Sequence, residues 1–160
     1  MSVLAFFRWC ESTSIAAAVR GSQWLFPAIE AGHLIALAVM GAAVLIVDLR
    51  LWGLGLRRRS VAEVAAGAQP LLVGSLVVIF VTGYALFATE ASTYYYNTAF
   101  WFKMIALLFA ILFTFSVRRK VVLADPERVG PVWGRLVALL SIALWSGVGI
   151  GAKAIGFSKL

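Results

Sequence analysis

Charged residues, and acidic residues above all, are scarce in this chain of 160 residues. Only 13% of the residues are charged and 62% are hydrophobic, whereas typical soluble domains have about 25% charged and about 45–50% apolar residues. So few charges cannot cover a water-facing surface, and much of the surface is therefore expected to face lipid. The composition excludes an ordinary soluble domain and indicates a single-domain integral membrane protein.

Cysteine and histidine occur once each, as Cys10 and His33. A single cysteine excludes an intrachain disulfide, a thiolate zinc or iron–sulfur site within one chain, and haem attachment through a pair of cysteines. The formal net charge of +7 does not indicate nucleic acid as a partner, because the basic residues lie between apolar runs, where membrane topology accounts for them.

Four apolar runs are each long enough to cross about 30 Å of hydrocarbon, which takes roughly 20 helical residues. Because the runs are continuous rather than alternating, they exclude a β-barrel. They lie at Trp24–Val47, Pro70–Thr89, Thr98–Val117 and Val132–Ala154. The sequence thus predicts an all-α integral membrane four-helix bundle over residues 24–160, preceded by an interfacial N-terminal segment over residues 1–23.

Local signals mark where three of these helices begin. Ser60-Val-Ala-Glu63 has the pattern of a capping box, so the second helix is expected to start before its apolar run. Asn97 is placed to cap the third helix. Asp125-Pro126-Glu127 is typical of a cap followed by a first turn, ahead of the fourth helix.

The basic residues predict the orientation of the bundle. Two loops on the same side of the membrane hold nine of the 14 lysines and arginines, whereas the Glu90–Asn97 loop on the other side holds none. The nine are Arg50, Arg57, Arg58, Arg59, Arg118, Arg119, Lys120, Arg128 and Arg135. The positive-inside rule then places both basic loops in the cytoplasm. We expect a multi-pass protein of the bacterial inner membrane, with both termini periplasmic.

Ionisable residues inside the predicted spans are the candidates for function, because a charge in hydrocarbon is costly. Glu30 and His33 share a face of the first span, and Lys103 lies in the third. At 1.5 Å per residue, His33 lies about 13 Å along from Trp24, and Lys103 lies about 8 Å along from Thr98. The pattern predicts one polar layer in the outer half of the bilayer and an inner half that is almost purely apolar.

The chemistry of His33 can be interpreted in several ways. Imidazole is the usual axial ligand of haem iron, and the sixth position would go to Lys103, to a methionine such as Met40 or Met104, to the histidine of a second chain, or to nothing. Alternatively, Glu30 and Lys103 form a buried ion pair that fixes helix register without any chemistry.

Three stretches resemble an uncharacterised family of small bacterial four-helix inner-membrane proteins: Trp24–Gly53, Thr82–Phe87 and Tyr96–Lys103. More distantly, a histidine early in the first span and a lysine early in the third resemble the copper-resistance D-type membrane proteins and the HemJ-type protoporphyrinogen oxidases. The HemJ-type proteins are four-helix haem b proteins that use a histidine and a lysine, which implies this role for His33 and Lys103. Their tryptophan- and arginine-containing signatures are absent after His33, so the oxidase activity is not carried over.

The sequence favours a haem b-binding membrane protein in redox chemistry or electron transfer, with quinone as a candidate electron partner. His33 is the expected metal ligand, and Glu30 and Lys103 are expected to complete the cofactor site. One alternative is a protein that handles copper or small cations with Glu30, His33 and Met40. Another is a structural accessory subunit. The expected partners are the lipid bilayer and either a second copy of the chain or a membrane redox protein.

Overall fold

The computed structural model describes residues 2–54, 58–124 and 130–157, most of which are helical. Within these residues four helices are long and apolar enough to cross a membrane: Leu25–Trp52, Val61–Thr89, Thr98–Leu123 and Val132–Phe157. The predicted all-α, four-span membrane architecture is therefore confirmed. The expected cap at Asp125–Glu127 lies outside the described residues, as do Arg57 and Arg128.

The first two spans are α3 (Leu25–Trp52) and α4 (Val61–Thr89). α3 ends at Gly53, whose φ of 90° is left-handed, the conformation that glycine adopts most readily at a helix C-terminus. α4 begins with the predicted capping box. The Ser60 hydroxyl accepts a hydrogen bond from the Glu63 backbone N–H (3.1 Å), and the Glu63 carboxylate accepts one from the Ser60 N–H (2.9 Å).

The third span consists of α6 (Thr98–Phe113), one π-helical turn η1 (Thr114–Arg118) and α7 (Arg119–Leu123). Asn97 caps α6 as predicted, since its side-chain oxygen accepts from the N–H groups of Ala99 and Phe100. The span ends at Leu123 rather than at Val117. The fourth span is α8 (Pro131–Phe157).

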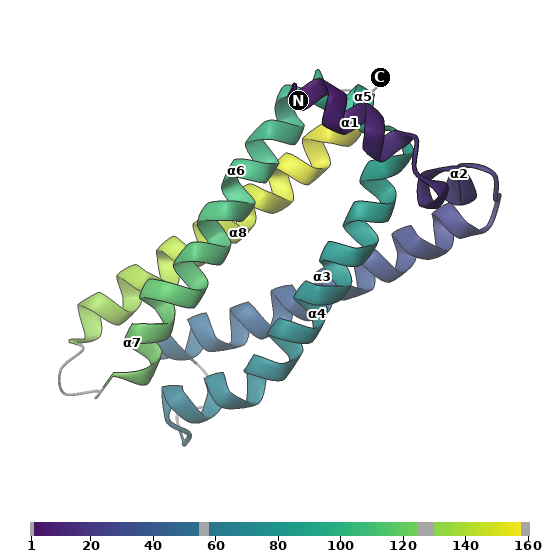
Figure 1. Ribbon diagram of the computed structural model, residues 1–160. Coiled ribbons are helices and arrows are strands. Elements are labelled where there is room, and N and C mark those ends of the chain that lie inside the picture. Colours follow the sequence, from purple (N-terminus) through teal and green to yellow (C-terminus); the bar gives the residue numbers. More distant parts are fainter. Residues whose placement is uncertain (1, 55–57, 125–129, 158–160) are drawn as a thin grey trace.

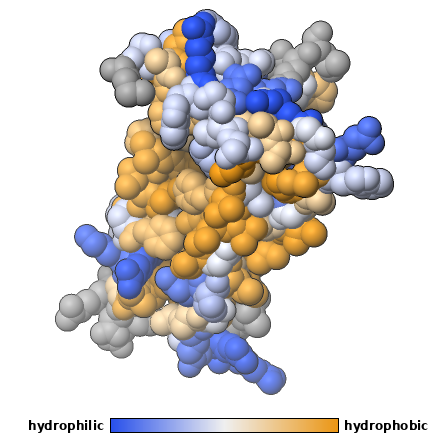
Figure 2. Space-filling view, turned by 45° about the vertical axis from the view of Figure 1, so that its right-hand side comes forward, coloured by the Kyte–Doolittle hydropathy of each residue, from blue (hydrophilic) through white to orange (hydrophobic). Residues whose placement is uncertain are grey.

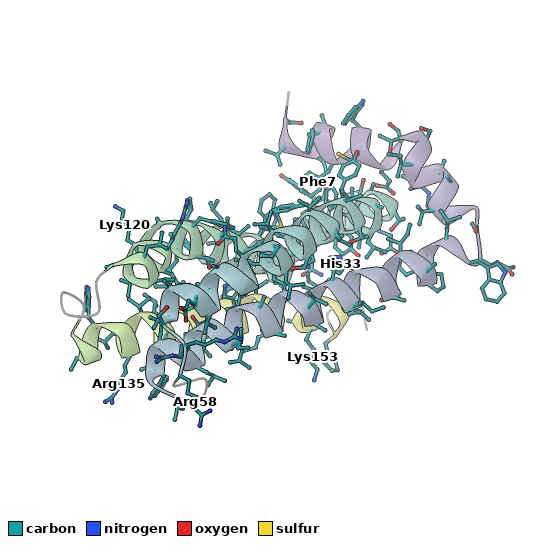
Figure 3. All side chains as sticks on the ribbon, turned by 90° about the horizontal axis from the view of Figure 1, so that it is seen from below. Phe7, His33, Arg58, Lys120, Arg135 and Lys153 are labelled. Atoms are coloured by element: carbon teal, nitrogen blue, oxygen red, sulfur yellow. The ribbon has the colours of Figure 1, made fainter. Side chains whose placement is uncertain are left out.

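The four spans are arranged as two helix pairs, α3 with α4 and α6 with α8, and α3 also packs on α8 (Figure 1). α4 meets the third span at α7, near one end of the bundle. We call this end, which holds α7, Arg58 and Arg135, the basic end, and Figure 3 shows Arg58, Lys120 and Arg135 gathered there.

The middle of the molecule presents an apolar surface. Large hydrophobic side chains on all four spans point outward, among them Ile35, Val81, Phe109 and Ile150. On the face drawn in Figure 2 they form a broad hydrophobic band between two more hydrophilic ends. This distribution suits a lipid bilayer around the band and water or headgroups at the ends.

The N-terminal segment forms two short helices, α1 (Val3–Glu11) and α2 (Ser14–Arg20). They are separated at Ser12 and Thr13, and the Thr13 hydroxyl donates to the Cys10 carbonyl (2.7 Å) and caps α2. α1 packs on α5 (Ala91–Tyr95), the short helix between the second and third spans. We call this end of the bundle the aromatic end.

An aromatic cluster forms the contact between α1 and the rest of the chain. The ring of Phe7 lies within 6.0 Å, centroid to centroid, of four rings from α4, α5 and α6: those of Phe87, Tyr95, Phe100 and Trp101. Phe7 and Cys10 are buried there. The N-terminal segment therefore covers the aromatic end instead of lying apart from the bundle.

Candidate functional site

His33 lies on α3, eight residues after the start of the helix, or about 12 Å along its axis. Its side chain is partly buried, and Figure 3 shows it between the helices. The ring Nδ1 lies 2.8 Å from the hydroxyl oxygen of Thr82 on α4. The Thr82 hydroxyl itself donates to the Val78 carbonyl at 2.6 Å. Because a hydroxyl has one hydrogen, the Nδ1–H of His33 donates to Thr82, and Nε2 keeps its lone pair.

Gly83, the residue after Thr82, has no side chain, which leaves space for the His33 ring. A Cβ at Gly83 would lie 3.3 Å from the His33 Cε1 atom, which is closer than most real Cβ contacts. The imidazole thus lies close against the backbone of α4. Thr82 and Gly83 together form a seat on α4 that fixes both the tautomer and the position of the His33 ring.

Lys103 lies on α6, five residues from its start, and is partly buried. A Cβ at Gly151 of α8 would lie only 3.1 Å from the Lys103 Cβ, so α6 and α8 approach each other closely at this level. The charge of Lys103 acts on His33. Among the described residues the Lys103 ammonium has no hydrogen bond and no ion pair.

Glu30 and Met40, which were also expected near His33, form no hydrogen bond or ion pair with it. Glu30 is exposed on α3 but remains within electrostatic range of His33. The alternative of a Glu30–Lys103 ion pair is not realised, since the ion pair found in the described part of the chain lies elsewhere. Met40 is buried in the hydrophobic core with Ala36, Ala43 and Val44. No group of three or more His, Cys, Asp or Glu side chains that could hold a metal ion occurs among the described residues.

A second polar site lies nearer the basic end, about 22 Å further along α3 than His33. The Arg118 Nε donates to one carboxylate oxygen of Asp48 at 2.7 Å, and the Ser141 hydroxyl donates to the other at 2.7 Å. Arg118 also donates to the Val44 carbonyl at 3.0 Å. Asp48 is completely buried and Arg118 is 5% exposed. The site therefore joins α3, η1 and α8 through charged hydrogen bonds.

This second site corrects two predictions. The half of the bundle expected to be almost purely apolar contains a buried ion pair, and Arg118 belongs to the third span rather than to a basic loop. The signal was present in the sequence. Asp48 follows the first apolar run directly, and Arg118 follows the third in the same way. Because both helices run from the aromatic end to the basic end, these positions lie at the same level.

Arg118 is the last residue of the π-helical turn η1. Thr114, the first residue of η1, is buried and accepts a hydrogen bond from the Trp145 Nε1–H of α8 at 3.2 Å. Single π turns inside α-helices locally change which side chains face a neighbouring helix, and they are frequent at functional sites. Here the turn follows α6, which holds Lys103, and its last residue is Arg118 of the buried Asp48–Arg118 pair.

Two open surface cavities are among those lined by described residues, and neither of the two includes His33 or Lys103. The first, of about 340 Å³, lies between α3 and α4 and is lined mainly by apolar and small side chains, including Gly32, Pro70 and Gly74. The second, of about 330 Å³, lies between α4 and the third span toward the basic end.

Comparison with known proteins identifies the family. The model of a family of unknown function, DUF6644, matches residues 6–158, nearly the whole chain. No curated protein and no solved structure matches significantly. The predicted membership of an uncharacterised family is thus supported, whereas no link to the copper-resistance D-type or HemJ-type proteins emerges. The chain belongs to the family of unknown function DUF6644.

Proposed function

We propose that this protein binds haem b within its membrane bundle through His33 and takes part in redox chemistry or electron transfer. The observation that carries the proposal is the hydrogen bond between His33 and Thr82. Histidines that ligate metals almost always donate their other ring N–H to a nearby acceptor, which fixes the tautomer and the ring orientation. His33 has this arrangement, with Nε2 left to bind a metal.

The donor set of the site suits haem. An iron porphyrin presents a metal that accepts an imidazole lone pair and two carboxylates that accept a cation. His33 offers the first group, and Lys103 offers a partly buried ammonium that has no partner among the described residues. Haem, when bound, supplies one-electron redox chemistry. The distant resemblance to haem b proteins that use a histidine and a lysine adds further support.

The chain's own residues would divide the remaining work. Thr82 and Gly83 hold the His33 ring in place against α4. Lys103 would hold a propionate or bind the iron through its amine. Glu30, exposed near the start of α3, would tune the site electrostatically or carry a proton to it. Copper handling by Glu30, His33 and Met40 receives less support, because Met40 is buried in the apolar core.

The proposal includes an orientation. We propose that the protein is in the bacterial inner membrane with the basic end in the cytoplasm and both termini in the periplasm, in accordance with the positive-inside rule. The His33 site would then lie toward the periplasmic side, where it would exchange electrons with quinone or a membrane redox partner.

The test is the visible spectrum of protein expressed with added haem and purified in detergent. Wild type is expected to show a reducible Soret band that His33→Ala loses or shifts. Thr82→Val removes the acceptor for Nδ1–H and is expected to weaken haem binding about 10- to 100-fold, as is usual for partners of metal ligands. Ser75→Ala is the matched control, since it removes another α4 hydroxyl that bonds within its own helix.

Other outcomes would overturn the proposal. A wild-type protein that binds no haem, or a His33→Ala variant with an unchanged spectrum, leaves a structural accessory role as the better interpretation. A colourless protein that retains copper in a fixed ratio would favour copper handling instead.

A further inference from the structure

The second cavity lies where α4 and the third span leave the apolar part of the bundle. Its walls are Ala62, Ala65 and Ala66 on one side and Phe115 and Val122 on the other, with Gln69 and Arg119 also lining it. We propose that this cavity is a binding site for an anionic phospholipid. The phosphate would bind to the Arg119 guanidinium and the Gln69 amide, and an acyl chain would run from there along Leu72 and Phe115 toward the apolar middle of the bundle.

The level of the cavity matches the headgroup region of a bilayer. On α4 it extends from Ala62, which precedes the apolar run starting at Pro70, to Leu72 within that run. On the third span it extends from Leu123, beyond the apolar run, back to Thr114 within it. Gln69 and Arg119 therefore lie just outside the two apolar runs, at the level expected of a phosphate, and Leu72 and Phe115 lie inside them, at the level of the acyl chains.

Two of the three polar side chains that line the cavity have no side-chain partner among the described residues. The Thr114 hydroxyl already accepts from Trp145, but Gln69 and Arg119 form no side-chain hydrogen bond or ion pair with another described residue. Arg119 differs in this respect from Arg118, whose charge is compensated by Asp48. Consecutive helical residues point about 100° apart, so the two arginines serve different sides of the helix.

The charge around the cavity favours an anionic ligand. Arg58 and Arg59 are both exposed, and Figure 3 shows Arg58 at the same end of the molecule. Basic pockets between transmembrane helices are suited to anionic headgroups, and each basic side chain near a lipid surface contributes about 1 kcal/mol. A soluble anion would use the guanidinium but not the apolar wall, so we commit to a phospholipid. The site is independent of the proposed haem site.

The experiment is native mass spectrometry of the detergent-purified protein, titrated separately with phosphatidylglycerol, phosphatidylcholine and inorganic phosphate. The expected result is one phosphatidylglycerol bound in preference to phosphatidylcholine. Arg119→Gln should lower the affinity at least about fivefold, which corresponds to the contribution of one basic side chain. Lys120→Gln removes the same charge from the neighbouring residue, which does not line the cavity, and should retain the preference.

A second variant separates the cavity from the charge. Ala66→Leu places a larger side chain in the cavity while every basic residue stays in place. This variant should also weaken phosphatidylglycerol binding. The proposal would be overturned if wild type bound the two lipids equally well, or if Arg119→Gln and Lys120→Gln lost the same amount of affinity for phosphatidylglycerol. Unchanged phosphatidylglycerol binding in Ala66→Leu would also overturn it. Inorganic phosphate that displaces the lipid at equal concentration would likewise overturn it, by showing a site for a free anion.

Discussion

The Asp48–Arg118 pair shows how a membrane bundle places charge in its interior. Both carboxylate oxygens have a donor, and the arginine also bonds a backbone carbonyl. Burying two charges is costly, and a complete set of hydrogen bonds offsets that cost. Because the partners come from α3, η1 and α8, the pair favours one register among three helices over its alternatives.

Removing one member of this pair is expected to be severe. Arg118→Met leaves the Asp48 carboxylate buried without its counter-charge, and such changes cost about 3–5 kcal/mol. The double variant Asp48→Asn with Arg118→Met should recover part of this loss, because neither charge is then left alone. The measurement is the free energy of unfolding in detergent for the two single variants and the double variant.

The control for the pair is Lys120→Gln, which removes an exposed positive charge close by and should change stability by less than about 0.5 kcal/mol. If the loss of unfolding free energy in the double variant equals the sum of the losses in the two single variants, Asp48 and Arg118 are not energetically coupled.

Gly83 gives a second test at the level of one residue. Glycine to alanine inside a helix normally stabilises by about 0.5–1 kcal/mol. Gly74→Ala on the same helix should show this gain, because a Cβ there meets nothing within 4 Å. Gly83→Ala should show less gain or a loss, because its Cβ meets the His33 ring at 3.3 Å. Thermal unfolding of the two variants, together with haem affinity, makes the comparison, and equal stabilisation would place the His33 ring elsewhere.

Among the elements, α1 and α2 depend on polar contacts as well as on the aromatic cluster. The Glu11 carboxylate accepts a hydrogen bond from the Ser92 N–H at 3.0 Å. Arg20 donates to the Thr89 carbonyl at 3.0 Å and to the Glu11 carbonyl at 2.9 Å. These bonds connect the N-terminal segment to the last residue of α4 and to α5, at the aromatic end of the second span.

The contact between Glu11 and Ser92 predicts a dependence on pH. Hydrogen bonds from the Ser92 side chain and backbone lower the pKa of Glu11 below its usual 4.5. A lowered pKa stabilises the docked state above pH 4.5, and this stabilisation is lost as the pH falls through the lower, folded pKa. Hydrogen exchange of residues 3–20, corrected for the intrinsic effect of pH, should show protection falling in that range.

The matched variants for this prediction are Glu11→Gln and Glu63→Gln. Glu11→Gln should remove the pH step, whereas Glu63→Gln, at the start of α4, should retain it. An identical pH profile in wild type and Glu11→Gln would mean that another group controls docking of the segment.

The sequence predicted where the helices lie better than it predicted which residues contact each other between helices. Apolar runs, the Ser60–Glu63 capping box and the Asn97 cap are local properties, so they could be recognised without a fold. The third span continues beyond its apolar run because a buried acid on another helix stabilises Arg118, which a hydropathy pattern does not register. The seat of His33 on Thr82 and Gly83 likewise depends on how α3 and α4 pack.

At the scale of the whole molecule, the proposed orientation can be tested with two engineered cysteines. Arg58→Cys and Tyr96→Cys are exposed positions at the basic and aromatic ends, and the native Cys10 is fully buried. In intact cells whose outer membrane has been permeabilised, a membrane-impermeant maleimide should label Tyr96→Cys and not Arg58→Cys. Wild type measures the background, and the reverse pattern would invert the topology.

The position of α1 constrains the order in which the molecule can assemble. The segment is synthesised before its partners, since Glu11 bonds a residue 81 positions later and Phe7 packs on rings from α4, α5 and α6. The nascent segment must therefore stay undocked until the third span has begun to leave the ribosome. In stalled chains of increasing length the Cys10 thiol should react with maleimide until about that point and then become protected. Residues made before all four spans are thus among the last to reach their native place.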